Sequence, residues 1–290
     1  MPSPRISPKR PAYQMITQGT VFCCAQATRY DNCDVKGLVI TARCDVKQNK
    51  FPVLNYLPIV SLPDWLRLDG LDILIDNETK KQRGELHRFL KEKGLSSTLV
   101  EAVPLDAIAT EHFQVDQGAA AQKKMAQRFR AHISAMTSFS SIIKGRRNDI
   151  YTWFCTNRTS DVQDLIQRLS RHSVLGYYFF ETLDPRNVDL VGFVCLLREV
   201  RVLSKSIAEC LGFGITQAKC NDICGRADGI NLSFAHEDLA MPIAELGSPG
   251  IEHVLQTFSN LFGRIGVPDP VDEEVKEIVR VNVHEQRTIQ

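Results

Sequence analysis

The sequence predicts an α+β fold in which two separated β segments complete one antiparallel sheet or small barrel around a helical insertion. Three observations predict this fold. Runs of β-branched and aromatic residues fill the region from Gly19 to Leu62. Amphipathic helical patterns replace them over residues 65–173, and β-type runs return from residue 174.

We expect five consecutive regions. Residues 1–13 combine four prolines with basic residues and have no periodicity, which is typical of a disordered or loosely docked arm. Residues 14–64 are expected to form the first part of the barrel and residues 65–173 the helical insertion. Residues 174–215 would supply the second part of the barrel with the helix that follows it, and residues 216–290 a C-terminal helical region.

The first β region contains the runs "GTVFCC", "GLVITARC" and "FPVLNYLPIVSL" in close succession. Three short strands with brief connections favour an antiparallel meander. A charged cluster separates the second run from the third, so this cluster is expected at the tip of a hairpin.

Two helices of the insertion are the clearest. The segment "GAAAQKKMAQRFRAHISAMTSFSSIIKG" places Met125, Phe129, Ile133 and Met136 three and four residues apart, which is the spacing of one helix face. The segment "TSDVQDLIQRLSRH" repeats the pattern with Ser160 as the expected N-cap.

The late β region contains "VLGYYFFETLD" and the longer strand candidate "LVGFVCLLREVRVL". Alternation along a strand places Glu199 and Arg201 on the same side of the sheet. We therefore expect them to form a structural ion pair.

Composition excludes several classes. The 290 residues are 43% hydrophobic and 24% charged with a net charge of +1, so an anionic partner has to be bound by a local basic patch. No apolar run approaches the roughly 18–20 residues of a membrane span, and the start of the chain lacks a signal-peptide core, so we expect a cytoplasmic protein without a membrane partner. Scattered cysteines among apolar neighbours are typical of reduced thiols.

The sequence also lacks the usual nucleotide and hydrolase motifs: it has no phosphate-binding glycine loop, no G-x-S-x-G and no H-E-x-x-H. Cys220 and Cys224 lie one helical turn apart, but no second close pair accompanies them. We therefore expect no cofactor and no metal.

The β segments resemble, in order and texture, the SH3-like barrel of the MazF/PemK toxin family. The resemblance rests on "KGLVITARCDVKQN", on the strand end "LPIV" and on "VGFVCLLREVRVLSKSIAECLG", and it covers less than half of the chain. It implies an endoribonuclease of a bacterial stress, antiviral defence or toxin–antitoxin system. Lys36 stands where the family usually has an arginine, and Val60 or Ser61 where it usually has a catalytic threonine, so the fold can transfer without the chemistry.

The hairpin tip holds the first candidate site. We expect Arg43, Cys44 and Asp45 as catalytic groups, because cationic neighbours lower a cysteine pKa, although Asp45 opposes that shift. The nucleic-acid contacts expected beside them are Lys36, Lys47 and Lys50. The alternative stays open that Cys44 ends a strand pointing inward while Asp45 and Asn49 build a turn.

A second basic group lies in the helical insertion. Arginines and lysines that hold phosphates, together with aromatics that stack on bases, are a common way to bind single strands. The residues expected to do this are Lys123, Lys124, Arg128, Arg146, Arg147, Tyr151 and Trp153. The alternative is a solvated helix face with its aromatics turned into the core.

Three hypotheses follow. The first is a protein that binds nucleic acid, RNA before DNA, and is a candidate for cleaving it. The second is a non-catalytic interaction subunit of a multi-protein complex, and a protein partner is expected under both. The third is a cysteine-dependent enzyme, for which His236 and His253 are candidate bases.

Overall fold

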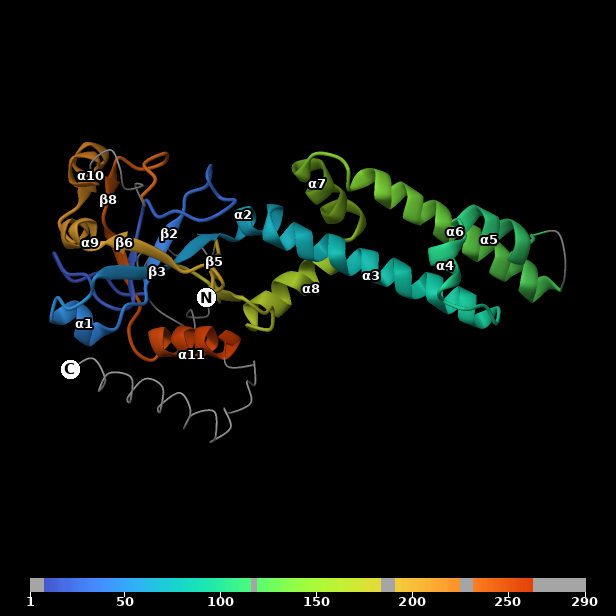
Figure 1. Ribbon diagram of the computed structural model, residues 1–290, viewed down its shortest axis with the longest axis horizontal. Coiled ribbons are helices and arrows are strands. Elements are labelled where there is room, and N and C mark those ends of the chain that lie inside the picture. The colour runs from blue at the N-terminus through green and yellow to red at the C-terminus, as the bar shows by residue number, and fades with distance from the viewer. Residues whose placement is uncertain (1–7, 116–118, 184–190, 225–231, 263–290) are drawn as a thin grey trace, which may run out of the picture.

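The computed structural model describes residues 8–115, 119–183, 191–224 and 232–262. Residues 1–7 of the expected arm and 263–290 of the expected C-terminal helical region lie outside these ranges. A sheet with its covering helices forms one end of the molecule, and long helices extend from it to the other end (Figure 1).

Within the described ranges, one antiparallel sheet contains seven strands: β1 (Thr20–Phe22), β2 (Lys36–Val39), β3 (Val53–Ser61), β4 (Tyr177–Phe180), β5 (Phe193–Leu196), β6 (Arg201–Ser204) and β9 (Pro242–Glu245). A separate two-stranded sheet contains β7 (Ile215–Thr216) and β8 (Leu239–Ala240).

The helices are α1 (Arg43–Lys47), α2 (Leu62–Arg67), α3 (Asp69–Glu92), α4 (Leu99–Ala102), α5 (Leu105–His112), α6 (Ala120–Ile142), α7 (Arg147–Asn157), α8 (Thr159–Ser170), α9 (Lys205–Leu211), α10 (Gln217–Cys224) and α11 (Gly250–Phe262). Helices α2 to α8 lie between β3 and β4, so they interrupt the strands of the sheet as the hydrophobic pattern predicts.

The meander and its completion by the late strands are confirmed. β1 pairs with β2 and β2 with β3, while the other edge of β3 pairs with both β5 and β6. Cys195 faces Ile59 and Arg201 faces Tyr56. The late segment therefore advances six residues while β3 advances only three. The single long strand expected from the sequence is therefore two strands, separated by a short irregular segment.

The expected ion pair joins that irregular segment to the first residue of β6. Arg201 Nε lies 2.7 Å from Glu199 Oε1. Glu199 also accepts hydrogen bonds from the backbone N–H and the hydroxyl of Thr28, at 2.6 and 2.9 Å. The pair thus connects the late strands to the loop between β1 and β2.

The sheet is open. Its strand order is β4-β5-β3-β2-β1-β9, and across the described ranges no pairing joins β4 to β9 to close a barrel. Strand β9 lies in the region expected to be helical. Pro242 disfavours a strand prediction, but an edge strand tolerates a residue without an N–H. Lys9 exchanges two backbone hydrogen bonds with Glu245, at 2.8 and 2.9 Å, so this part of the N-terminal segment 1–13 is docked on β9.

Both faces of the sheet are buried. Leu54, Tyr56 and Val60 of β3 pack in one core with α2, α3, α8 and α9, whereas Leu57 and Ile59 point to the opposite core with α11. Figure 1 shows α11 lying beside the sheet. Burial on both sides explains why β3 is a nearly continuous apolar run and not an alternating one.

The extended helices have a core of their own. Leu86 and Phe89 of α3 pack with Phe113 and with Phe129 of α6, and the rings of Phe113 and Phe129 stack at 3.7 Å. We call α3 to α6 the helical arm. In α8 the expected buried stripe is confirmed, but the helix begins at Thr159 after Arg158, so the prediction of Ser160 as N-cap is wrong.

Candidate acid–base pocket

The expected hairpin tip is a short helix. Residues Arg43–Lys47 form α1, and its Ala42 N-cap makes no side-chain hydrogen bond. Cys44 is exposed, with Sγ donating to Asp45 Oδ1 at 3.5 Å, so the expectation that Cys44 points inward is wrong. The expected turn lies at the end of this helix, where Asn49 has a φ of 53° and Lys50 N–H donates to Asp45 O at 2.9 Å.

The positions of the toxin resemblance have other contacts. Lys36 Nζ lies 2.6 Å from Asp34 Oδ2 and over the ring of Phe193. Val60 is fully buried. The Ser61 hydroxyl accepts from Asp64 N–H and donates to the Asp64 carboxylate, which makes it the N-cap of α2. The hydroxyl at this position therefore stabilises a helix end.

The two predicted basic groups are far apart. Figure 1 places α1 at one end of the molecule and α6 along the arm at the other end. Lys47 and Lys50 are exposed beside α1, and Lys123 and Lys124 are exposed at the start of α6. The structure does not bring these lysines into a single site.

The other residues of the second basic group differ in their contacts. Arg128 lies over the ring of Phe89, and Arg146 is exposed. Tyr151 and Trp153 are half-buried against the core, where the Trp153 ring contacts Phe139 and Phe154 and lies under Arg158. The two aromatics are therefore not a free stacking platform.

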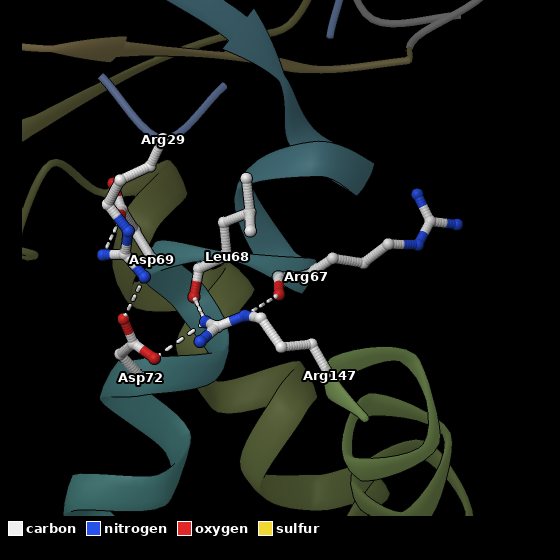
Figure 2. A network of polar contacts seen from close by, with 6 residues as sticks. All are labelled: Arg29, Arg67, Leu68, Asp69, Asp72 and Arg147. Atoms are coloured by element: carbon white, nitrogen blue, oxygen red, sulfur yellow. Dashed lines mark hydrogen bonds and ion pairs between the residues drawn. The ribbon is translucent and has the colours of Figure 1, made fainter. Parts of the chain in front are cut away.

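Arg147 belongs to a polar network at the base of the arm (Figure 2). Its Nη2 donates to Leu68 O at 2.6 Å and to Asp72 Oδ1 at 2.7 Å, and its Nε donates to Arg67 O at 3.2 Å. Asp72 lies between two guanidinium groups, because Arg29 Nη2 is 2.6 Å from its other oxygen. This network holds α7 and the β1–β2 loop against the start of α3.

Asp72 is held in its charged form. Partial burial by itself would raise the pKa of its carboxyl, but the hydrogen bonds from Arg29 and Arg147 outweigh that effect and lower the pKa. The ion pairs that connect α3 to α7 and to the β1–β2 loop therefore explain the lowered pKa of Asp72.

A pocket with a different character lies where β4, α8 and α11 meet. It has a volume of about 580 Å³, and histidine, tyrosine, lysine and glutamate side chains line it together. The lining residues are Lys9, His172, Tyr178, Phe179, Glu181, His253 and the loop Gly247, Ser248, Pro249 and Gly250. We call this the histidine pocket.

His172 occupies a backbone position that usually belongs to glycine. It follows α8, its φ is 55°, and the N–H groups of His172 and Ser173 donate to Leu169 O and Arg168 O. A left-handed residue closing a helix is most often glycine, because a Cβ is strained there. Keeping an imidazole at such a position favours a functional role for it.

The orientation of His172 is fixed by its neighbours. Its ring stacks on Tyr178 with centroids 4.0 Å apart, and its Nδ1 accepts from Phe179 N–H at 3.4 Å. Because Nδ1 is an acceptor, the neutral ring carries its proton on Nε2.

Tyr178 connects the two histidines. Its hydroxyl lies 2.6 Å from His253 Nδ1, and its ring is fully buried between the sheet and α11. The rings of His172 and His253 are 5.5 Å apart. His253 itself is exposed on the first turn of α11, so one face of the cluster is open to a ligand.

Lys9 adds a cation at the rim. The pairing of its backbone with Glu245 brings the side chain over Gly247, where a Cβ would lie 3.2 Å from Lys9 Nζ. The pocket also lies at the amino end of α11, where the helix dipole favours negative charge. Two imidazoles, the ammonium group of Lys9 and the carboxyl group of Glu181 therefore line one pocket, so candidate acid–base groups and a cation lie together at the amino end of α11.

Sequence reasoning identified His253 among these residues and missed Lys9, His172 and Tyr178. His172 is the last residue of the segment 159–172 that was predicted to be a helix, and a histidine where glycine is expected was the available signal. Tyr178 and Lys9 had none, because only the sheet brings residues so far apart in the chain together.

No group of three or more histidine, cysteine, aspartate or glutamate side chains within the described ranges is arranged to hold a metal ion. In the same ranges no helix is long and apolar enough to cross a membrane. Comparisons with protein-family models, with curated proteins and with solved structures found no match.

Proposed function

We propose that this protein binds RNA and cleaves it in the histidine pocket. The observation that carries the proposal is a pair of imidazoles that both contact Tyr178, with Lys9 lining the same pocket. His172 stacks on the Tyr178 ring, and His253 Nδ1 lies 2.6 Å from the Tyr178 hydroxyl. The pocket volume of about 580 Å³ lies within the roughly 300–1,000 Å³ of small-ligand sites and accommodates a nucleotide.

RNA supplies its own nucleophile, so the protein needs a base, an acid and a cation. One imidazole takes the proton of a ribose 2′-hydroxyl, whose oxygen forms a bond to phosphorus. The bond from phosphorus to the 5′-oxygen breaks, and the other imidazole donates the proton that this oxygen takes up. Lys9 and the amino end of α11 stabilise the charge that builds on the phosphate.

The basic residues predicted from the sequence become contacts for the RNA chain outside the pocket. Lys36, Lys47 and Lys50 near the sheet, and Lys123, Lys124 and Arg128 on the arm, are proposed to bind phosphates. Arg43 is proposed as one more such contact. Arg147 already holds the base of the arm, so its replacement tests stability as well as binding.

The setting proposed is the bacterial cytoplasm, in a stress or defence system of the kind that the resemblance to MazF/PemK toxins implies. The antiparallel sheet supports this proposal in one respect: β1, β2 and β3 form the expected meander, and the late strands β5 and β6 pair with β3. The histidine pocket replaces the expected tip residues Arg43, Cys44 and Asp45 as the catalytic centre.

The test is cleavage of end-labelled single-stranded RNA by the wild type, by His253→Ala and by His236→Ala. His236 is also exposed, but it is not among the residues of the pocket, so it is the matched control. We expect about a 100-fold or larger loss of cleavage for His253→Ala, the size of a general acid–base contribution, and none for His236→Ala. Equal activity of the three proteins would overturn the proposal.

A second candidate is a subunit that docks a protein partner without catalysis. It is favoured by exposed apolar side chains on adjacent segments: Met15, Phe213 and Leu239 are 59%, 66% and 39% exposed. Gly212 packs on Gln14, and Gly214 packs on Leu239, so these segments share one surface. Wild-type protein that neither binds nor cleaves RNA would make this candidate the leading one.

A further inference from the structure

Two consecutive cysteines lie at the end of β1, outside the histidine pocket. Cys23 and Cys24 are 2% and 4% exposed, and a single segment, Glu237–Met241, covers them. Glu237, Asp238, Leu239 and Met241 are all exposed. The segment Glu237–Met241 therefore lies between the two thiols and the solvent.

The sulfur atoms are hydrogen-bonded to the segment that covers them. Cys23 Sγ lies 3.2 Å from Leu239 O and accepts from Met241 N–H at 3.4 Å. Cys24 Sγ donates to Glu237 O at 3.6 Å. These contacts attach the covering segment to the end of β1.

The backbone and the protonation of the pair are both unusual. Cys24 has a φ of 62°, in the left-handed region that favours glycine. A hydrogen bond from the Cys24 thiol lowers the pKa of Cys23 to about 7, with further help from Met241 and against the effect of burial. The pKa of Cys24 is raised by the same hydrogen bond and by burial. Of the two thiols, Cys23 is therefore the more readily deprotonated and Cys24 the one that keeps its proton.

We propose that Cys23 and Cys24 are a redox-active vicinal dithiol that a hydroperoxide converts to a disulfide. The Cys23 thiolate attacks the peroxide, the O–O bond breaks, and Cys23 becomes a sulfenic acid while an alcohol or water leaves with a proton. The Cys24 sulfur then attacks the Cys23 sulfur and water leaves. Two thiols lose two electrons, and these reduce one peroxide.

The disulfide would be easily reversed. Consecutive Cα atoms are about 3.8 Å apart, shorter than the roughly 4.4–6.8 Å of ordinary disulfides, and such strain favours reduction by thiols. Oxidation also removes the S–H of Cys24, so its hydrogen bond to Glu237 O is lost. The covering segment stays joined to the end of β1 by the hydrogen bond from Cys23 N–H to Met241 O, so the change is confined to the part of the segment around Glu237.

The test is treatment of the full chain with one equivalent of hydrogen peroxide at pH 7, alkylation of the remaining thiols and mass analysis of the peptides. Cys44 is the comparison because its thiol is exposed, unlike those of Cys23 and Cys24. We expect the Cys23–Cys24 peptide to lose two hydrogen atoms and resist alkylation while Cys44 is alkylated, and added dithiothreitol to restore both thiols. Oxidation of Cys44 with Cys23 and Cys24 still alkylated would overturn the proposal.

A variant separates the two steps. Cys24→Gly suits the left-handed backbone and removes the second thiol, so the fold is expected to be kept, as circular dichroism would verify. In this variant peroxide should leave a sulfenic acid on Cys23 that dimedone traps, whereas the wild type gives the disulfide and little trapped product. The same Cys23 product in both proteins would contradict the proposed role of Cys24.

Discussion

At the scale of residues, the histidine pocket depends on side chains that violate local preferences. His172 holds a left-handed position that glycine fills best, and the fully buried Tyr178 places its hydroxyl 2.6 Å from Nδ1 of the exposed His253. Such positions are maintained against a conformational cost, which is why they suggest function. By contrast Cys44, which the sequence suggested, lies on an exposed helix with Asp45 as its contact.

His172→Gly tests the pocket without a large structural penalty. Glycine relieves the strain of φ 55°, worth roughly 1–2 kcal/mol, and this gain offsets the lost stacking on Tyr178. We expect the free energy of unfolding to stay within about 1 kcal/mol of the wild type, with RNA cleavage reduced about 100-fold or more. Urea unfolding and a cleavage assay measure both, and an active His172→Gly protein would remove His172 from the mechanism.

Tyr178→Phe tests the contact between the Tyr178 hydroxyl and His253. The substitution keeps the stack on His172 and the ring contact with Phe180 but removes the hydroxyl that lies 2.6 Å from His253 Nδ1. Loss of one hydrogen bond of about 1 kcal/mol predicts roughly a fivefold fall in kcat, measured in the RNA cleavage assay. An unchanged kcat would show that the hydroxyl takes no part in the reaction.

At the scale of elements, periodicity predicted most of the architecture and failed where local signals conflict. The meander, the long helices and the return of the chain to β3 all follow from apolar spacing. Strand β9 was missed because Pro242 argues against a strand, and α1 because its residue types favour a turn as much as a helix. The break between β5 and β6 was missed because Leu197 to Val200 continue the β-type pattern.

Asp72→Asn tests the joint at the base of the arm. The folded-state pKa of Asp72 is lowered, so its contribution to stability is present above about pH 4 and is lost as the pH falls through the folded-state value. Because the carboxyl is 44% exposed, solvent screening limits the effect to about 1 kcal/mol.

The measurement is the midpoint of urea unfolding between pH 3 and pH 7, with Asp76→Asn as the control. Asp76 forms an exposed pair with Lys80 on the same helix. We expect Asp72→Asn to be the less stable protein near neutral pH, and the difference from the wild type to shrink below about pH 4. A difference that does not change with pH would show that the joint is not electrostatic.

Arg158→Ala tests the buried ion pair between α3 and the start of α8. Glu78 is 3% exposed, and its Oε1 lies 3.1 Å from Arg158 Nη2. Removing one partner leaves a buried carboxylate poorly compensated, so we expect a loss of about 3 kcal/mol in unfolding free energy. Arg168→Ala, at an exposed pair with Asp164, should cost well under 1 kcal/mol. Equal costs would contradict this account of Glu78.

At the scale of the whole molecule, the sheet gathers the pocket from distant parts of the chain. Lys9 lies near the N-terminus and pairs with β9. His172 follows the last helix of the insertion, Tyr178 lies on β4 and His253 on α11. Sequence patterns predict which segments become strands, but they do not predict which strand ends meet. The fold was therefore predictable in outline, whereas three of the four groups of the site were not.

The central claim is that the pocket uses the ribose 2′-hydroxyl of RNA as the nucleophile. The most direct test is incubation of the wild-type protein with a labelled single-stranded RNA and with the same strand in which the ribose at each mapped cleavage site is replaced by deoxyribose. We expect both strands to bind with similar affinity at the same salt, because phosphates dominate binding, and only the all-ribose strand to be cut at those sites. Cleavage of the deoxyribose sites at an undiminished rate would contradict the account.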